Sequence, residues 1–328
     1  MFDIITFGSA TLDIAITMPR EHIKADEKMI SGKYYCFNLG SKLDVDDMYF
    51  GFGGGGVNTA TTFKNQGFSV AYCGMVGDDV PGREIIEYLN REGIESGFVK
   101  KTKAKSTNNS VILDEPNDDR TVLSYRGASE LLSKKDLPAN LAAKWFYLAP
   151  LSGKLSTITD DIISYAVKNN IRTAVNFGNS QLKMPKAKLL KLLNKIDVLI
   201  LNKEEASLFT GVSYKDEEKI IERMADLHNG INVMTKGEDG VVVVASGKVY
   251  EAKLKKFKVT DETGAGDAFG SGFVSGLIKT KDIEYAIKLG LTNSKYAISE
   301  KGATTGLLSE KQNNLVEKEK IKVAVTPI

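Results

Sequence analysis

The sequence has few of the residues that build disulfide scaffolds or histidine-based metal sites. Among 328 residues there are 2 cysteines, Cys36 and Cys73, and 2 histidines, His22 and His228. Two cysteines are too few for a disulfide framework and indicate a reducing compartment, so we expect both to be small buried side chains. The histidines stand far apart in the chain, which does not favour a histidine-based metal site or catalytic dyad.

A charge excess and a long apolar run are also missing. Lys plus Arg number 44 and Asp plus Glu 42, which gives no field that would draw the protein to nucleic acid or to a membrane. No apolar stretch has the length of a transmembrane helix, and Met1–Thr6 lacks a basic signal-peptide start. With 42% hydrophobic and 26% charged residues, the composition is that of a globular protein. We therefore expect a cytoplasmic protein, and we see no repeat or linker that would divide residues 1–328.

The most informative stretch reads Asp-Glu-Thr-Gly-Ala-Gly-Asp and ends at Asp267. Asp261 and Thr263 are expected to interrupt a strand and cap a helix, while Gly264 and Gly266 permit tight turns and close approach of a ligand. Apolar residues recur at helical spacing from Asp267 onward, so the spacing predicts a helix that begins there. A glycine-rich turn before a helix N-terminus offers free N–H groups to an anion such as phosphate.

Asp267 is unusual at such an anion site, because a phosphate repels a carboxylate. The carboxylate has a purpose if it takes the proton from the group that attacks the phosphate. The alternative is an ordinary helix whose aspartate interacts favourably with the helix dipole.

Two further stretches indicate a ligand near the N-terminal part of the chain. Asp13 follows the predicted strand Asp3–Phe7, where α/β sheets place ligands, although it could equally be a turn residue. Four successive glycines, Gly53 to Gly56, leave bare backbone before a predicted helix, which could also be a flexible hinge. Asn58 in the first turn of that helix can donate and accept hydrogen bonds, as recognition of a hydroxyl requires.

The second half of the chain alternates apolar strands with amphipathic helices, which predicts a mostly parallel, doubly wound sheet. Asn202 and Glu205 follow one such strand and share a face of an opening helix turn, where a glutamate is favourable in any case. The stretch 235–240, Thr-Lys-Gly-Glu-Asp-Gly, is either a plain hairpin turn or a ligand loop. We expect separate helices over 283–291 and 294–299, and a peripheral tail from Ser309.

Two β-rich segments, at about 14–52 and 98–126, interrupt this alternation and predict a small extra sheet. The second contains a hairpin joined by Pro116–Asp119.

Four motifs in order, at Asp13, 53–58, 202–205 and 261–267, make the chain resemble the ribokinase-like (PfkB) sugar and nucleoside kinases over nearly its whole length. The resemblance implies one three-layer α/β/α domain with a small β lid, ATP and Mg²⁺ as cofactors, and a homodimer formed through the lid. It makes Asp267 the catalytic base and Gly264, Ala265 and Gly266 the anion hole.

The resemblance also assigns binding positions. Substrate would meet Asp13, Gly54, Gly55 and Asn58. Nucleotide would meet Asn202, Thr235, Gly237, Gly240 and Asn293, the last of which could also be a surface residue. Glu205 would serve Mg²⁺, partly through water. A monovalent cation such as K⁺ would be held at Asp261, Thr263, Ala297, Glu300, Gly302 and Gly306.

The leading hypothesis is an ATP-dependent phosphotransferase that phosphorylates the hydroxyl of a hydroxymethyl group on a sugar or related polyol. The alternatives are an adenosine-like nucleoside kinase, a non-catalytic sugar or nucleoside sensor, and a dinucleotide-dependent oxidoreductase, since 264–270 is near Gly-x-Gly-x-x-Gly. A substrate that is already phosphorylated would need a basic lid contact, for which Lys28, Lys33, Lys42 and Arg126 are candidates.

Overall fold

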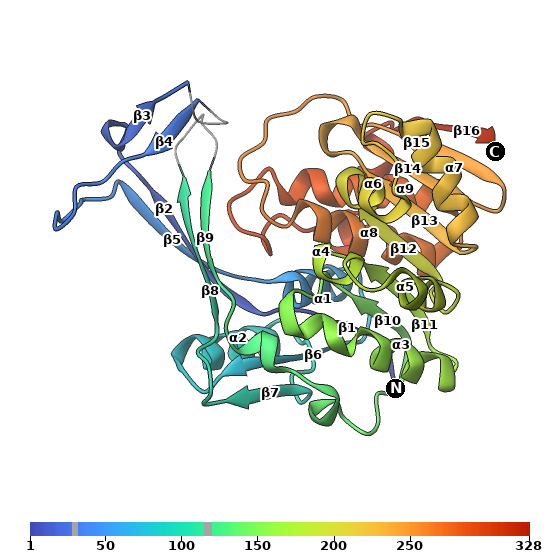
Figure 1. Ribbon diagram of the computed structural model, residues 1–328, viewed down its shortest axis with the longest axis horizontal. Helices are drawn as coiled ribbons and strands as arrows, with labels where there is room; N and C mark the ends of the chain where they lie inside the picture. The colour runs from blue at the N-terminus through green and yellow to red at the C-terminus, as the bar shows by residue number, and fades with distance from the viewer. Residues whose placement is uncertain (28–31, 115–119) are drawn as a thin grey trace.

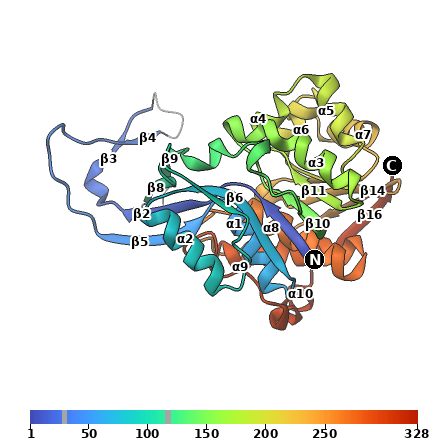
Figure 2. The same cartoon turned by 90° about the horizontal axis from the view of Figure 1, so that it is seen from below.

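The computed structural model describes residues 1–27, 32–114 and 120–328. A large sheet lies between two layers of helices, and a small sheet projects from this body as a lid (Figure 1). The view from below shows the lid strands leaving the body beside α1 and α2 (Figure 2). Lys28 and the hairpin loop Pro116–Asp119 lie outside the described residues.

The large sheet has ten strands in the order β16-β15-β14-β13-β12-β11-β10-β1-β6-β7. The seven strands from β13 to β7 in this order run parallel to one another. Beyond β13, the strands β14, β15 and β16 each pair antiparallel with the strand before them. The predicted mostly parallel sheet is confirmed. Its strands are β1 (Phe2–Phe7), β6 (Val70–Gly77), β7 (Val99–Thr102), β10 (Ala143–Leu148), β11 (Arg172–Asn176), β12 (Val198–Asn202), β13 (Ile231–Thr235), β14 (Val241–Ala245), β15 (Lys248–Ala252) and β16 (Val323–Pro327).

The helices form the outer layers. One face of the sheet packs against α1 (Gly55–Asn65), α2 (Val80–Arg91), α8 (Ala265–Thr280) and α9 (Ile283–Ala297). The other face packs against α3 (Thr159–Lys168), the short α4 (Asn179–Leu182), α5 (Lys186–Leu193), α6 (Lys203–Thr210) and α7 (Glu217–Leu227). Successive residues of β1 serve opposite faces, Ile4 toward α1 and Ile5 toward α3, so the strand must be apolar on both sides.

The lid is a four-stranded sheet in the order β5-β2-β8-β9. Its strands are β5 (Asp47–Gly53), β2 (Thr11–Thr17), β8 (Asn108–Asp114) and β9 (Thr121–Tyr125), and the hairpin of β3 (Ile23–Ala25) and β4 (Lys33–Tyr35) extends from it. The two sequence insertions therefore combine in one sheet, as expected. The second insertion is shorter than expected, because β7 pairs with β6 in the large sheet.

Four local expectations are wrong. Helix α9 is continuous through the position where we expected a break. The C-terminal tail is part of the body, since the short α10 (Asn314–Lys318) buries Val316 and β16 extends the sheet beside β15. Cys73 is buried as expected, but Cys36 is exposed. No strand precedes Asp261 within 253–260.

In the described part of the chain no helix is long and apolar enough to cross a membrane.

Candidate active site

The N-terminus of α8 has the open geometry that an anion site requires. The helix begins at Ala265, and Gly264 precedes it with a left-handed φ of 78°, which favours glycine. Thr263 does not cap the helix, contrary to our expectation, because its N–H and Oγ1 donate to Asp261 Oδ1 at 2.8 and 2.6 Å. The N–H of Ala265 donates to Glu262 O at 3.2 Å. With no side chain over this helix end, the first-turn amides can face a ligand.

Asp267 lies in the first turn of α8, half-buried beside α1. Asn58 Nδ2 of α1 donates a hydrogen bond to Asp267 Oδ2 at 2.9 Å, which joins two motifs 209 residues apart. Burial raises the pKa of the Asp267 carboxyl, and the hydrogen bond from Asn58 opposes this rise. A raised pKa moves a carboxylate toward the range in which a general base works near neutral pH.

Asp13 and Asn58 lie on either side of Gly53. A Cβ atom on Gly53 would collide with Asp13 Oδ2 and lie 3.6 Å from Asn58 Oδ1. Because glycine has no Cβ, the space beside both side chains stays open. Asn58 Oδ1 is buried and has no hydrogen-bond partner within residues 1–27, 32–114 and 120–328. An unsatisfied buried acceptor is costly, which suggests that a ligand hydroxyl supplies the missing donor.

Asp13 does not follow the first strand directly but lies within β2 of the lid. Burial raises the pKa of the Asp13 carboxyl to about 6, the hydrogen bond with Ser110 lowers it, and the charge of Asp261 raises it further. A carboxylate held in a partly desolvated position like this binds hydroxyl donors strongly once ionised.

The glycines before α1 allow the backbone to approach Asp267 closely. Gly54 stands at the helix start with φ of 89°, and Gly55 is the first helical residue, earlier than the expected Val57. A Cβ on Gly55 would lie 2.8 Å from Ala149 Cβ and 3.4 Å from Asp267 Oδ1. A larger residue at 55 would therefore fill the space beside the catalytic candidate.

Two cavities of about 380 Å³ each flank the loop that leads into α8. The first lies under the lid and is lined by Asp13, Tyr49, Ile112 and Thr263 among others. The second is lined by Thr235, Gly237, Gly240 and Gly266, with the apolar side chains Phe269, Leu291 and Ile298. Arg120, Val259 and Glu262 border both cavities, so the two spaces meet beside the N-terminus of α8.

Asn202 and Glu205 form a reciprocal cap at the start of α6. The Glu205 N–H donates to Asn202 Oδ1, and the Asn202 N–H donates to Glu205 Oε2, both at 2.8 Å. Burial raises the pKa of Glu205 to about 7, although the hydrogen bond from Asn202 lowers it. Asn202 pairs in register with Thr235, so this turn adjoins the 235–240 loop at the carboxyl edge of the sheet.

Comparison with known proteins identifies the family. The family model described as pfkB family carbohydrate kinase matches residues 21–310. The chain belongs to the pfkB family of carbohydrate kinases. The predicted fold, family and class of enzyme, an ATP-dependent carbohydrate kinase, are confirmed, and family membership decides against the dinucleotide-dependent oxidoreductase.

Individual relatives agree with this family. A ribokinase of Haemophilus influenzae is 27% identical over 291 residues, which cover 87% of this chain and 92% of the relative. A ribokinase II of E. coli, solved in complex with ATP and Mg²⁺, has a TM-score of 0.79 at 15% identity, covering 97% of this chain and 99% of that one. A nucleoside kinase of Methanocaldococcus jannaschii has a TM-score of 0.76 at 22% identity, covering 96% and 98%.

The position expected to hold a monovalent cation is already occupied by hydrogen-bond donors in this kinase. Asp261 Oδ1 accepts from Thr263 and from Arg120 Nη1 at 2.5 Å, and Asp261 Oδ2 accepts from the Gly302 N–H at 3.0 Å. Burial alone would raise the pKa of Asp261, but these hydrogen bonds and the Arg120 charge lower it. Of the other expected positions, Ala297 is buried and Glu300 is exposed, and Gly302 and Gly306 have positive φ. The side chains present therefore do not favour K⁺ at Asp261.

Asn293 is neither a surface residue nor part of the second cavity wall. Its side chain is fully buried, Nδ2 donates to Ala268 O at 2.8 Å, and Oδ1 accepts from the Leu308 N–H at 2.8 Å. The amide is thus used to join α9 to α8 and the following loop, and the expected contact with a nucleotide base is wrong.

Arg120 is the functional candidate that the sequence did not reveal. It stands just before β9 of the lid and reaches across to Asp261 of the body. Its partner is 141 residues away, and no local pattern marks such a pairing. The lid residues that we had named, Lys33, Lys42 and Arg126, are exposed.

Proposed function

We propose that this kinase transfers the γ-phosphoryl group of ATP to a hydroxymethyl group of a sugar or related polyol, with Asp267 as general base. The contact between Asn58 and Asp267 carries the proposal. It brings a hydroxyl-recognising amide, whose oxygen has no hydrogen-bond partner among the described residues, to a carboxylate at a helix N-terminus that suits phosphate.

The reaction follows from the placement of these groups. The substrate oxygen forms a bond to the γ-phosphorus while the bond between that phosphorus and the β–γ bridging oxygen breaks, and ADP leaves. Asp267 accepts the proton of the attacking hydroxyl. The amides of Gly264, Ala265 and Gly266, at the positive end of the α8 dipole, would stabilise the charge on the phosphoryl group, for which the Ala265 N–H must exchange its bond to Glu262 O for one to the ligand. Asp13 and Asn58 hold neighbouring hydroxyls and so orient the nucleophile.

Nucleotide is proposed to lie in the second cavity, along Thr235, Gly237 and Gly240, with the base against Phe269 and Leu291. Mg²⁺ would neutralise charge on the phosphates, and Asn202 and Glu205 are the candidate residues that hold it, in part through water. The described residues contain no cluster of three or more His, Cys, Asp or Glu that could form a protein cage for a metal. Such a setting fits a cation bound mainly by phosphates and water.

The charges around the first cavity support an uncharged substrate. Its lining includes four carboxylates and three cations, namely Asp13, Asp114, Asp261, Glu262, Arg120, Lys258 and Lys301. Arg120 pairs with Asp261 and Lys301 lies 3.8 Å from Asp47, so Lys258 is the one cation of this lining without an ion pair among the described residues, and a phosphate on the substrate would meet a single unpaired positive charge. Because ATP is the donor, we propose that the kinase works in the cytoplasm.

The lid sheet is proposed to cover the substrate with its inner face and to join a second copy of the chain through its outer face. Tyr49, Ala15 and Ile112 are on the inner face, where they line the first cavity. The pairing register places Phe50 and Leu123 on the opposite face, with exposed fractions of 60% and 56%. A set of exposed apolar side chains on one face marks a partner surface.

A screen of ATP consumption tests the function and the substrate together. It should include free sugars, sugar phosphates and nucleosides, each with and without K⁺. We expect turnover with one or more free sugars and little effect of K⁺. Turnover with nucleosides alone would establish the nucleoside kinase, whereas ligand binding without ATP consumption would establish the sensor.

A further inference from the structure

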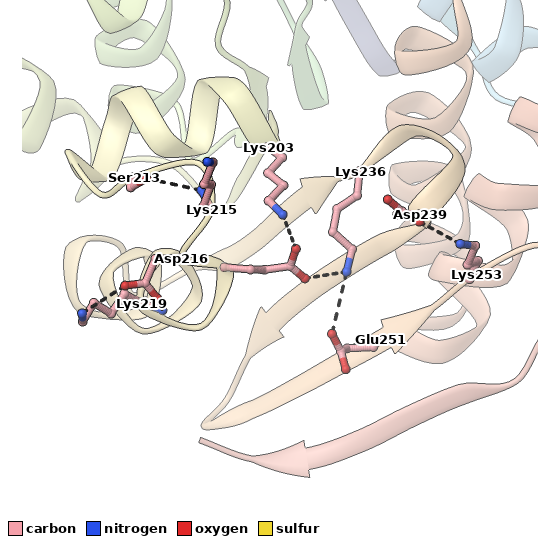
Figure 3. Close-up of polar contacts among 10 residues, drawn as sticks. Lys203, Ser213, Lys215, Asp216, Lys219, Lys236, Asp239, Glu251 and Lys253 are labelled. Atoms are coloured by element: carbon pink, nitrogen blue, oxygen red, sulfur yellow. Dashed lines mark hydrogen bonds and ion pairs between the residues drawn. The ribbon is translucent and has the colours of Figure 1, made fainter.

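Glu217, the first residue of α7, forms ion pairs with two lysines from different turns. Lys203 Nζ lies 2.6 Å from Glu217 Oε2, and Lys236 Nζ lies 2.6 Å from Glu217 Oε1. Figure 3 shows Lys203 and Lys236 approaching the same carboxylate from two sides. The exposed fractions of the side chains are 18% for Lys203, 14% for Lys236 and 28% for Glu217. Solvent therefore screens these ion pairs less than it screens pairs on the open surface.

The two lysines belong to the turns proposed to face the nucleotide. Lys203 follows Asn202 directly at the start of α6. Lys236 stands between Thr235 and Gly237, which both line the second cavity. The carboxylate of Glu217 therefore ties together two turns at the carboxyl edge of the sheet.

Lys203 is placed where it needs this partner. It is the first residue of α6, and a cation at a helix N-terminus is disfavoured by the helix dipole. The hydrogen bond to Glu217 raises the pKa of Lys203, and its ammonium also lies 4.9 Å from the centre of the Tyr214 ring. The pKa of Glu217 is lowered, because the hydrogen bonds from Lys203 and Lys236 outweigh the effect of burial.

Lys236 holds a short hairpin loop between β13 and β14, in which a single 3₁₀ turn is closed by the Lys236 N–H, a donor to Gly240 O at 2.8 Å. The loop contains Gly237 and Gly240 with φ of 58° and 91°, conformations that leave the chain many alternatives when it is not held. Lys236 reaches Glu217, and Glu251 Oε1 lies 3.9 Å away as a second, more exposed partner. On the far side of the same turn, Lys253 pairs with Asp239 at 2.8 Å (Figure 3).

We infer that Glu217 is a positioning residue for the nucleotide. It fixes the 202–205 turn through Lys203 and the 235–240 loop through Lys236, and so sets the affinity for ATP without touching it. The inference rests on one part of the proposed function, namely that ATP binds along these two turns. A charge-assisted pair of this kind contributes mainly by keeping the site in its binding geometry before the ligand arrives.

The test measures the Kd for ATP by calorimetry, KM for ATP and for the sugar, and the thermal midpoint. Glu217→Gln keeps the shape of the side chain and removes its charge. We expect the Kd and KM for ATP to rise roughly ten-fold, as for loss of a charged hydrogen bond. KM for the sugar should stay unchanged. Lys236→Met should have a similar or smaller effect, because it breaks one of the two pairs that Glu217→Gln breaks, and the double variant should bind ATP little more weakly than Glu217→Gln alone.

Two exposed neighbours on the same helix turn serve as controls, Glu218→Gln and Lys219→Met. Both should leave the affinity for ATP unchanged. The inference is overturned if Glu217→Gln lowers only the thermal midpoint, or if it raises KM for ATP and sugar alike. A wild-type protein that binds ATP but phosphorylates nothing would refute the proposed function and leave this Kd comparison valid, whereas one that binds no ATP would refute both.

Discussion

At the scale of single residues, the chemistry depends on where two carboxylates stand. Asp13 and Asp267 come from distant parts of the chain, and Asn58 lies between them, with its Nδ2 bonded to Asp267 and its Oδ1 without a hydrogen-bond partner in the described part of the chain. Asn58 Nδ2 gives Asp267 Oδ2 its donor, which leaves the remaining oxygen free to accept a proton. Under the proposed function, this arrangement gives the asparagine the task of binding a substrate hydroxyl and the aspartate that of accepting its proton.

Asp267→Asn should abolish most of the activity. The amide Nδ2 of Asn58 needs an acceptor, so the carboxamide oxygen of the variant will turn to it and present an NH₂ group to the substrate hydroxyl. Loss of the base should lower kcat by about 10²–10⁴. Affinity for ATP should hold or improve, because a negative charge near the phosphates is gone. Steady-state kinetics, ATP binding and the thermal midpoint on one variant are the measurements, and near-normal kcat would remove Asp267 from the mechanism.

Asp13→Asn should make the protein more stable and less able to bind sugar. Burial raises the pKa of Asp13 to about 6 from 3.8, so the folded state holds its proton where the unfolded chain has lost it. Stability therefore falls as pH rises from about 4 to 6, by at most about 3 kcal/mol, and the loss persists at higher pH.

The variant escapes this penalty, so its thermal midpoint should exceed that of the wild type at pH 8 and approach it near pH 4. KM for the sugar should exceed that of the wild type at pH 8, where Asp13 is ionised, and the difference should shrink toward pH 4, where the wild-type carboxyl is protonated. A variant with a lower thermal midpoint than the wild type at pH 8 would contradict the argument that ionised Asp13 destabilises the folded state.

At the scale of elements, the start of α6 combines a structural cap with a proposed metal role. Glu205 closes the cap with Asn202, and this function needs only an oxygen acceptor and a backbone N–H. Its pKa of about 7 means that Mg²⁺ must compete with a proton at neutral pH.

Glu205→Gln separates the two roles, because a glutamine oxygen can still accept from the Asn202 N–H. We expect the wild type to need more Mg²⁺ for half-maximal activity as pH falls from 8 to 6, by up to about ten-fold per pH unit below the pKa. The variant should need more Mg²⁺ throughout, without this pH dependence, and keep its KM for sugar. Glu204→Gln, the exposed neighbour, should behave as the wild type. Equal loss of sugar and Mg²⁺ affinity would instead make Glu205 purely structural.

The elements of the body could be predicted from the sequence because their signals are local. The alternation of apolar strands with amphipathic helices predicted the mostly parallel sheet, and the glycine run at 53–56 marked the start of α1. The loop into α8 was less predictable, since Gly264 rather than Thr263 precedes the helix, and the helix begins at Ala265 instead of the expected Asp267. The strand β16 was missed because pairing with a distant edge strand leaves no local pattern.

The site was predicted where motifs are contiguous and missed where partners are distant. The glycine-rich motifs named both Asn58 and Asp267 as site residues, and the fold brings these two side chains into hydrogen-bond contact. The ion pairs of Arg120 with Asp261 and of Glu217 with Lys203 and Lys236 were invisible, because their geometry is set by the fold. Asn293 looked like a ligand residue and proved to be a buried link between helices.

At the scale of the whole molecule, the proposed dimer depends on the difference between the two faces of the lid. The pairing register aligns Phe50, Ile14, Val111 and Leu123 in one row across β5, β2, β8 and β9. The neighbouring row, which includes Tyr49, Ala15 and Ile112, faces the first cavity. A sheet apolar on both faces is stable only if both are covered.

Phe50→Glu should therefore convert a dimer to a monomer. Phe50 is 60% exposed in the single chain, and a charge buried in a lid–lid contact would be uncompensated. We expect the dimer Kd to rise at least roughly 30-fold, as for loss of a central interface residue. Light scattering after size-exclusion chromatography, over a range of protein concentrations, measures this. Leu208→Glu is the matched control, because Leu208 is equally exposed, at 60%, but lies on α6 away from the lid. A wild type that stays monomeric at high concentration, or a Phe50→Glu variant that stays dimeric, would show that the outer face of the lid is not the interface.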